Sequence, residues 1–170
     1  VVLFYPNQDT VIGAYLKPRL PGFMEEGKVV LTDFHQTGRV SFRHLDLLVP
    51  LALPGDTGAF GAVVLRIDPQ NVLYPLIKVW PVSSKSAESL LFHRDGDEVV
   101  YLSELRHAEG SEMSLRLPVS MDKLPAAMAL RGVRVTTDGI DYRGVPVIAV
   151  MNKIPESPWY LVAKIDREEL

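Results

Sequence analysis

The chain contains two copies of one pattern of strands and turns, and this repeat limits its fold more than any other feature. Each copy begins with an apolar segment, a polar turn and a second apolar segment, and Asp9 and Asp97 hold matching places in the two turns. The matching segments keep one order along the chain: 2–12 with 90–100, 30–33 with 135–138, 49–53 with 145–149, and 63–68 with 161–166. The offset between matching segments is not constant: it is 88 residues at the first match (2 to 90) and 98 at the last (63 to 161). Two similar units are therefore expected, the second with the longer middle.

Each copy is expected to form five strands. Asp95-Gly96 is a strong hairpin signal, and polar or proline-rich turns at 6–9, 54–58 and 155–158 separate other apolar runs. The expected strands are 1–5, 10–16, 28–34, 42–53 and 60–67 in the first copy, and 88–94, 97–103, 133–138, 145–152 and 159–165 in the second.

The segment between the second and third strands differs between the copies. In the second copy, 120–131 holds an alanine-rich run with high helix propensity, and Gly132 is a suitable stop. In the first copy, Pro18 and Pro21 limit any helix to about one turn near 23–26. We therefore expect an α+β fold with two domains, 1–75 and 76–170, each an antiparallel five-stranded sheet with short helices.

Two further helix starts are expected at the joints. Pro69 follows Asp68, which favours a helix there. Its apolar face would consist of Val72, Leu73, Leu76 and Ile77. After the last strand, Asp166 and Glu169 have the spacing of a capping box, so a helix that continues into a longer protein is expected from Asp166.

Composition excludes several classes of function. The 18 Lys and Arg residues are outnumbered by 21 Asp and Glu, so the chain lacks the basic excess of a nucleic-acid-binding protein. There is no cysteine, which removes disulfide scaffolds, thiol catalysis and iron–sulfur ligation. Neither a glycine-rich phosphate loop nor a Gly-x-Ser-x-Gly motif occurs. We therefore expect neither catalytic residues nor a cofactor.

Four segments resemble the double Cache sensor domain of bacterial membrane receptors. Residues 141–147 and 154–166 are similar to the end of its membrane-proximal lobe, with the pattern D-Y-x-G-x-P-V followed by W-x-L-V-A-K-I-D. Residues 88–105 are similar to the beginning of that lobe, and 65–81 to the joint between lobes. The resemblance implies two tandem PAS-like lobes, preceded by a long N-terminal helix that is missing here.

The resemblance also implies a cellular context. Such domains are the extracytoplasmic, periplasmic parts of inner-membrane receptors, including sensor histidine kinases of two-component systems and diguanylate cyclases. The implied partners are a small-molecule ligand, the receptor's own transmembrane helices and cytoplasmic output domain, and a second copy in a homodimer. Ligands usually bind the membrane-distal lobe, but the motif of the amino-acid-binding branch has no match in 16–27.

The first copy contains two Asp/His pairs that flank one loop. Asp33 and His35 end the third strand, and His44 and Asp46 open the fourth. Because side chains alternate along a strand, each pair would share a face if the two strands pair through the loop. Two imidazoles and two carboxylates would suit a divalent metal, a polar organic ligand, or hydrogen-bonded pairs at a sheet edge. Histidine would also permit pH sensing.

A second ligand pocket is expected in the second copy, lined by Tyr101, Arg116, Asp138, Asp141 and Tyr142. We expect the chain to be a non-enzymatic sensor domain that transmits a ligand-induced shift to its C-terminal helix. One alternative is a metal-dependent β-rich enzyme that uses Asp33, His35, His44 and Asp46. A second alternative is a spacer without a ligand.

Overall fold

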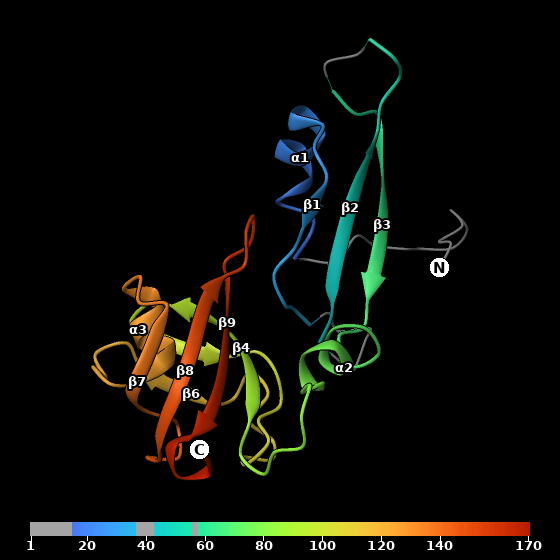
Figure 1. Ribbon diagram of the computed structural model, residues 1–170. Coiled ribbons are helices and arrows are strands. Elements are labelled where there is room, and N and C mark those ends of the chain that lie inside the picture. The colour runs from blue at the N-terminus through green and yellow to red at the C-terminus, as the bar shows by residue number, and fades with distance from the viewer. Residues whose placement is uncertain (1–14, 37–42, 56–57) are drawn as a thin grey trace. The chain divides into compact units, whose positions relative to one another are not determined.

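The computed structural model describes residues 15–36, 43–55 and 58–170, and it has an α+β fold with two sheets and a few short helices (Figure 1). The chain divides into two compact units, Val1–Leu73 (unit 1) and Tyr74–Leu170 (unit 2). The division falls two residues before the boundary expected at 75. The expected strand 1–5, the turn 6–9 and most of the expected strand 10–16 lie outside the described residues.

Unit 1 has a three-stranded antiparallel sheet in the described residues, with the order β1-β2-β3. Its elements are α1 (Leu20–Glu26), β1 (Val30–Leu31), β2 (Leu45–Leu51) and β3 (Gly61–Ile67). They confirm the expected strands 28–34, 42–53 and 60–67, although the first is much shorter than expected. Tyr15 and Leu16 lie in a turn instead of a strand. Leu16 and Phe23 pack with Leu48 of β2, so α1 covers the face of the sheet to which Leu48 belongs.

The helix α1 begins earlier than the expected turn near 23–26. Pro21 lies in its first turn, where a backbone N–H has no partner inside the helix, so the proline removes no helical hydrogen bond. The helix ends at Gly27, whose φ of 61° is in the left-handed region.

Unit 2 has a six-stranded antiparallel sheet with the order β6-β5-β4-β9-β8-β7. Its strands are β4 (Glu88–Asp95), β5 (Glu98–Tyr101), β6 (Arg116–Pro118), β7 (Val135–Ile140), β8 (Pro146–Lys153) and β9 (Trp159–Asp166). All five expected strands are confirmed. The sixth, β6, was not expected because its three residues are too few to show an alternating pattern.

The core of unit 2 lies between the sheet and α3 (Pro125–Leu130). Large buried side chains from β4, β5, β8 and β9 pack against small residues of this helix: Phe92, Tyr101, Met151 and Val162 against Ala126, Ala127 and Ala129. The expected stop at Gly132 is confirmed, since its N–H bonds to the carbonyl of Ala129 and its φ is 86°.

Each unit has a β-bulge at the same place in its sheet. In unit 2, Thr136 pairs with Ala149 and Gly139 with Val147, which leaves two residues between the pairs on β7 and one on β8. In unit 1, the N–H of Thr32 bonds to the carbonyl of Asp46 at 2.9 Å, and His35 pairs with His44. Two residues, 33–34, again stand against one, Leu45. Each extra residue moves the side chains that follow it to the opposite face of their strand.

The helix at the first joint is α2 (Leu73–Lys78), which begins four residues after the expected start at Pro69. The carboxylate of Asp68 accepts hydrogen bonds from the N–H of Gln70 and the side chain of Asn71, so the chain makes a turn first. The expected apolar face is wrong, because Leu76 is 71% exposed and Tyr74 is buried. The buried hydroxyl of Tyr74 donates a hydrogen bond to the carbonyl of Leu102, so the whole side chain can lie in the interior.

The chain leaves β9 through η1 (Arg167–Glu169), a single 3₁₀ turn. The expected capping box is wrong. Asp166 makes no capping bond with its side chain, because its carboxylate binds Arg143. Glu169 instead binds the segment before β4. In the part of the chain that the structure describes, no helix has the length and apolar character needed to cross a membrane.

Candidate functional site

Three of the four Asp/His side chains expected in unit 1 meet in one buried group, which we call the His–Asp cluster: His35, His44 and Asp46. The His35 Nε2 atom lies 3.1 Å from Asp46 Oδ2, and His44 Nε2 lies 4.0 Å from the same oxygen. One ligand atom from each residue lies within 4.8 Å of the others. All three side chains are at most 4% exposed. The cluster is on the face of β2 that also carries Leu48, since His44, Asp46 and Leu48 alternate along the strand.

Arg66 of β3 fixes the carboxylate of Asp46. The two residues are cross-strand partners, and Arg66 donates from Nε to Oδ1 at 3.0 Å and from Nη2 to Oδ2 at 3.3 Å. Burial alone would raise the pKa of Asp46, but the hydrogen bonds from His35 and Arg66, together with their charges, hold it below its usual value. Asp46 is therefore ionised at neutral pH and can only accept hydrogen bonds.

The imidazole rings are held by their neighbours. His35 stacks on Tyr15, with ring centres 3.9 Å apart and planes 10° apart, and the guanidinium of Arg19 covers Tyr15 at 3.9 Å. His44 meets His35 edge to face at 4.4 Å. The Nδ1 atom of His35 lies 3.0 Å from the carbonyl oxygen of Asp33. Since a carbonyl only accepts, this contact places a proton on Nδ1 and turns Nε2 towards Asp46.

The structure does not bring the side chain of Asp33 to the cluster. The bulge at 33–34 shifts the register by one residue, so Thr32 takes the place opposite Asp46 and accepts the Asp46 N–H on its hydroxyl at 2.8 Å. The Asp33 carboxylate accepts the N–H of Phe34. The expectation that Asp33 and His35 share one face assumed an unbroken strand.

The cluster offers two imidazole nitrogens and one carboxylate oxygen on a fixed backbone. These donor types bind zinc and other first-row transition metals, and they also recognise polar organic molecules. Of the described residues, His35, His44 and Asp46 are the group of His and Asp side chains close enough to hold a metal ion.

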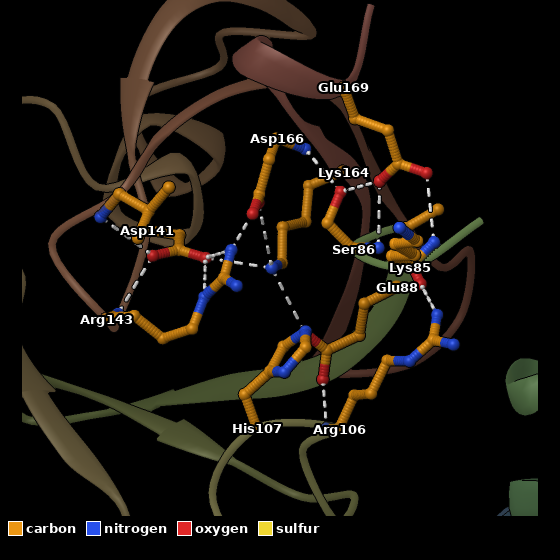
Figure 2. A network of polar contacts seen from close by, with 12 residues as sticks. Lys85, Ser86, Glu88, Arg106, His107, Asp141, Arg143, Lys164, Asp166 and Glu169 are labelled. Carbon is orange, nitrogen blue, oxygen red and sulfur yellow. Dashed lines mark hydrogen bonds and ion pairs between the residues drawn. The ribbon is translucent and has the colours of Figure 1, made fainter.

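A second buried polar group lies in unit 2, and we call it the Lys164 network (Figure 2). The ammonium group of Lys164, whose side chain is fully buried, lies 2.8 Å from Asp141 Oδ2 and 3.3 Å from Glu88 Oε2. Arg143 binds both Asp141 and Asp166. Burial would raise the pKa of Asp141, but Arg143 and Lys164 outweigh it and hold this pKa below its usual value.

The tyrosines expected in the second pocket are near this network. Tyr142 donates its hydroxyl to Glu88 Oε2 at 2.9 Å, and burial together with the Glu88 charge raises its pKa. Tyr101 is 1% exposed, its ring lies 6.0 Å from that of Tyr142, and burial raises its pKa as well. The expected residues Tyr101, Asp141 and Tyr142 therefore gather in the structure, as part of the core and of the ion-pair network.

A cavity of about 610 Å³ opens beside the Lys164 network, between α2 and the segments around β4. Its walls include Trp80, Glu88 and Arg106, and none of Tyr101, Asp141 or Tyr142 lines it. The guanidinium of Arg106 donates to the carbonyls of Ala87 and Ser84, so it supports the wall of this cavity.

Several residues of both groups were not found from the sequence. Arg66 and Tyr15 complete the His–Asp cluster, and Glu88, Lys164 and Asp166 complete the Lys164 network. A usable signal exists for Lys164, because it stands two residues after Val162, on the side of β9 that the pattern assigns to the interior. A lysine at such a position requires buried carboxylates. No local signal marks Tyr15.

Comparison of the chain with models of known protein families finds no match, and comparison with curated proteins finds no match either.

Proposed function

We propose that this chain is the extracytoplasmic sensing part of a transmembrane receptor of the double Cache kind, in which unit 1 binds a small ligand and unit 2 passes the change to the C-terminal segment. The receptor would act as a homodimer and carry a kinase or cyclase output domain. The chain itself would have no enzymatic activity.

The course of β9 is the observation that carries the proposal. This strand lies inside the sheet of unit 2, between β4 and β8, and its last residue leads directly into η1. Lys164 and Asp166 near its end bind side chains from β4 and from the turn before β8. A shift in the sheet would therefore move the exit of the chain.

The plan of unit 2 gives further support. The strands β4 to β6 precede α3 and β7 to β9 follow it, and all six belong to one antiparallel sheet. The resemblance predicts a similar plan, with two strands, a helical insert and three more strands. In unit 1 the third, fourth and fifth expected strands form the same antiparallel meander.

The His–Asp cluster is the part of unit 1 best suited to a ligand. It lies on the face of the sheet that α1 covers, and it brings charged and aromatic groups together. A ligand that binds one arrangement of β2 and β3 more tightly than another would shift the population of that arrangement.

A thermal-unfolding screen tests the proposal, with organic acids, amino acids, purines, polyamines and divalent metal ions. A ligand at 100 times its Kd adds about 2.7 kcal/mol of stability, which is several degrees in Tm. Hydrogen exchange of 159–169, measured with and without the hit, then tests transmission. Binding that leaves this segment unchanged contradicts the sensor. A screen without hits favours the spacer, and a metal-dependent turnover of substrate would favour the enzyme.

A further inference from the structure

We propose that the His–Asp cluster of unit 1 is a binding site for a divalent transition-metal ion, and specifically for Zn²⁺. This proposal specifies the ligand of the sensing site proposed above. The metal site itself does not depend on the sensor function, and only the role of the ion in signalling rests on it. The ligands are His35 Nε2, His44 Nε2 and one oxygen of Asp46. The site departs from the expectation that this chain needs no metal.

The first argument comes from unit 2, which builds the same bulged sheet without a polar group at this place. Because the bulges coincide, the strand pairing puts Gly139 where unit 1 has His35, Val147 where it has His44, and Ala149 where it has Asp46. Gly139, Val147 and Ala149 are all buried. The fold of a unit therefore does not require two histidines and an aspartate at the bulge.

The second argument is the geometry of the donor atoms. Zinc bonds of about 2.0–2.1 Å to nitrogen and oxygen set neighbouring ligand atoms of a tetrahedron roughly 3.3 Å apart. The two Nε2 atoms lie 3.1 Å and 4.0 Å from Asp46 Oδ2, and one ligand atom of each residue lies within 4.8 Å of the others. The donor atoms therefore need to approach one another by at most about 1.5 Å. Because His35 and His44 are direct cross-strand partners, the backbone already brings the two rings together.

The third argument is the surrounding shell of hydrogen bonds. Histidines that bind metals usually donate their second ring N–H to a carbonyl or carboxylate, and the ligating carboxylate is itself hydrogen-bonded. His35 Nδ1 has the carbonyl of Asp33 at 3.0 Å, and Asp46 Oδ1 has Arg66 Nε at 3.0 Å. These contacts direct His35 Nε2 and Asp46 Oδ2 to the same point.

An ion pair between Asp46 and Arg66 is the simpler explanation of a buried carboxylate. It accounts for Asp46, and the hydrogen bond from His35 adds to it. It does not explain why a second imidazole lies beside the same carboxylate, with His44 Nε2 4.0 Å from Asp46 Oδ2. Two imidazoles and one carboxylate suit zinc, whereas magnesium and calcium prefer oxygen ligands alone.

The experiment uses the whole 170-residue chain, freed of metal with a chelator. Zn²⁺ is titrated in competition with a chromophoric chelator, and Co²⁺ is titrated separately to record visible absorption bands of a low-symmetry site. The variants are His44→Ala and His44→Val, and the matched control is His107→Ala, which removes an exposed histidine of unit 2 that meets Tyr142 through its backbone N–H. Circular dichroism reports whether each variant folds.

We expect one Zn²⁺ per wild-type chain, unchanged binding in His107→Ala, and at least about 10-fold weaker binding in both His44 variants. A wild-type chain that takes up no stoichiometric Zn²⁺ overturns the site, and this result does not depend on whether any variant folds. Equal loss in His107→Ala also overturns it. Hydrogen exchange of 159–169 in the zinc-loaded chain separates the two proposals: tight binding without a change there keeps the metal site and contradicts the sensor.

Discussion

In unit 1 the cross-strand partner of Arg66 is Asp46, and in unit 2 the residue opposite Lys164 on the corresponding strand is Ala149. Both cations are next to the bulge, at equivalent places in the two sheets. Arg66 finds its carboxylate on the neighbouring strand, whereas Lys164 takes Asp141 from the turn before β8 and Glu88 from β4 on its other side. Unit 2 thus has no carboxylate at the place of Asp46, and its buried cation is bound by carboxylates from β4 and from the turn before β8.

This difference indicates that the Lys164 network stabilises its unit, whereas the sheet can form without the His–Asp cluster. The Lys164 network joins β4, β9 and the segment between β7 and β8, and its lysine is fully buried. The His–Asp cluster occupies positions that unit 2 fills with Gly139, Val147 and Ala149. Substitutions in the network should therefore reduce stability, and substitutions in the cluster should mainly reduce binding.

The largest effect is expected for Lys164→Met. The change leaves Asp141 and Glu88 without their buried cation, and loss of one partner of a buried ion pair costs about 3–5 kcal/mol. Urea unfolding followed by tryptophan fluorescence measures it, because Trp80 and Trp159 are the chain's two tryptophans and both belong to unit 2. Lys123→Met is the control, since the ion pair of Lys123 with Asp138 is exposed and its loss should not change the unfolding midpoint. Equal effects of the two changes would contradict the role given to Lys164.

The two glycines Gly139 and Gly22 should respond in opposite ways to alanine. A Cβ on Gly139 would lie 3.0 Å from Pro125 Cγ and 3.1 Å from Thr136 Cγ2, so Gly139→Ala should destabilise unit 2 by about 1–3 kcal/mol. Gly22 lies inside α1, and a Cβ there meets nothing within 4 Å. Gly22→Ala should stabilise unit 1 by about 0.5–1 kcal/mol, because glycine loses more backbone freedom in a helix. Tryptophan fluorescence for unit 2 and hydrogen exchange of α1 for unit 1 measure the two changes. A stabilised Gly139→Ala variant would show that α3 does not approach the bulge so closely.

A smaller effect on stability is expected for His44→Val, which places in unit 1 the residue that unit 2 has at Val147. Replacing a buried polar side chain by an apolar one of suitable size is often neutral, so we expect a change below about 1.5 kcal/mol. Hydrogen exchange of the β2 amides measures it. Loss of exchange protection throughout β2 would mean that the cluster holds unit 1 together, and the two units would then differ less than we infer.

The sequence was a good guide where a strand alternates without interruption. The strands of unit 2 lie within a few residues of their expected bounds, and the Asp95-Gly96 hairpin forms, with Gly96 at a φ of 59°. The pairing also puts Lys164 where Arg66 lies, in agreement with the expected offset of 98 residues. The match of 49–53 with 145–149, an offset of 96 residues, is wrong. Asp46 pairs with Arg66 and Ala149 pairs with Lys164, so Asp46 and Ala149 hold equivalent positions, and the offset on this strand is 103. Two Val-Pro dipeptides resembled each other by chance.

The errors at the site have one cause in common: the prediction used a rule about neighbouring residues, and the side chain's position depends on residues far away in the chain. A single extra residue at 33–34 leaves the apolar pattern almost unchanged, yet it removes Asp33 from the face of His35. Asp166 has the chemistry of an N-cap, but Arg143, 23 residues away in the chain, takes its carboxylate. The sequence identified His35, His44 and Asp46 because both pairs flank one loop. It could not identify Tyr15, which belongs to the turn before α1.

The smallest effect concerns the tie between η1 and the segment before β4. The carboxylate of Glu169 accepts hydrogen bonds from the Ser86 and Ser84 hydroxyls and from the N–H groups of Lys85 and Ser86, which lower its pKa from 4.5 to about 2. Because the folded pKa lies below the unfolded one, the tie contributes fully above about pH 4.5 and is lost as the pH falls through 2. Amide chemical shifts of Lys85 and Ser86 should follow a titration with its midpoint near 2, and Glu169→Gln should abolish it. A midpoint near 4.5 would mean that η1 is not held to β4, and that a movement of β9 reaches the C-terminal segment without this contact.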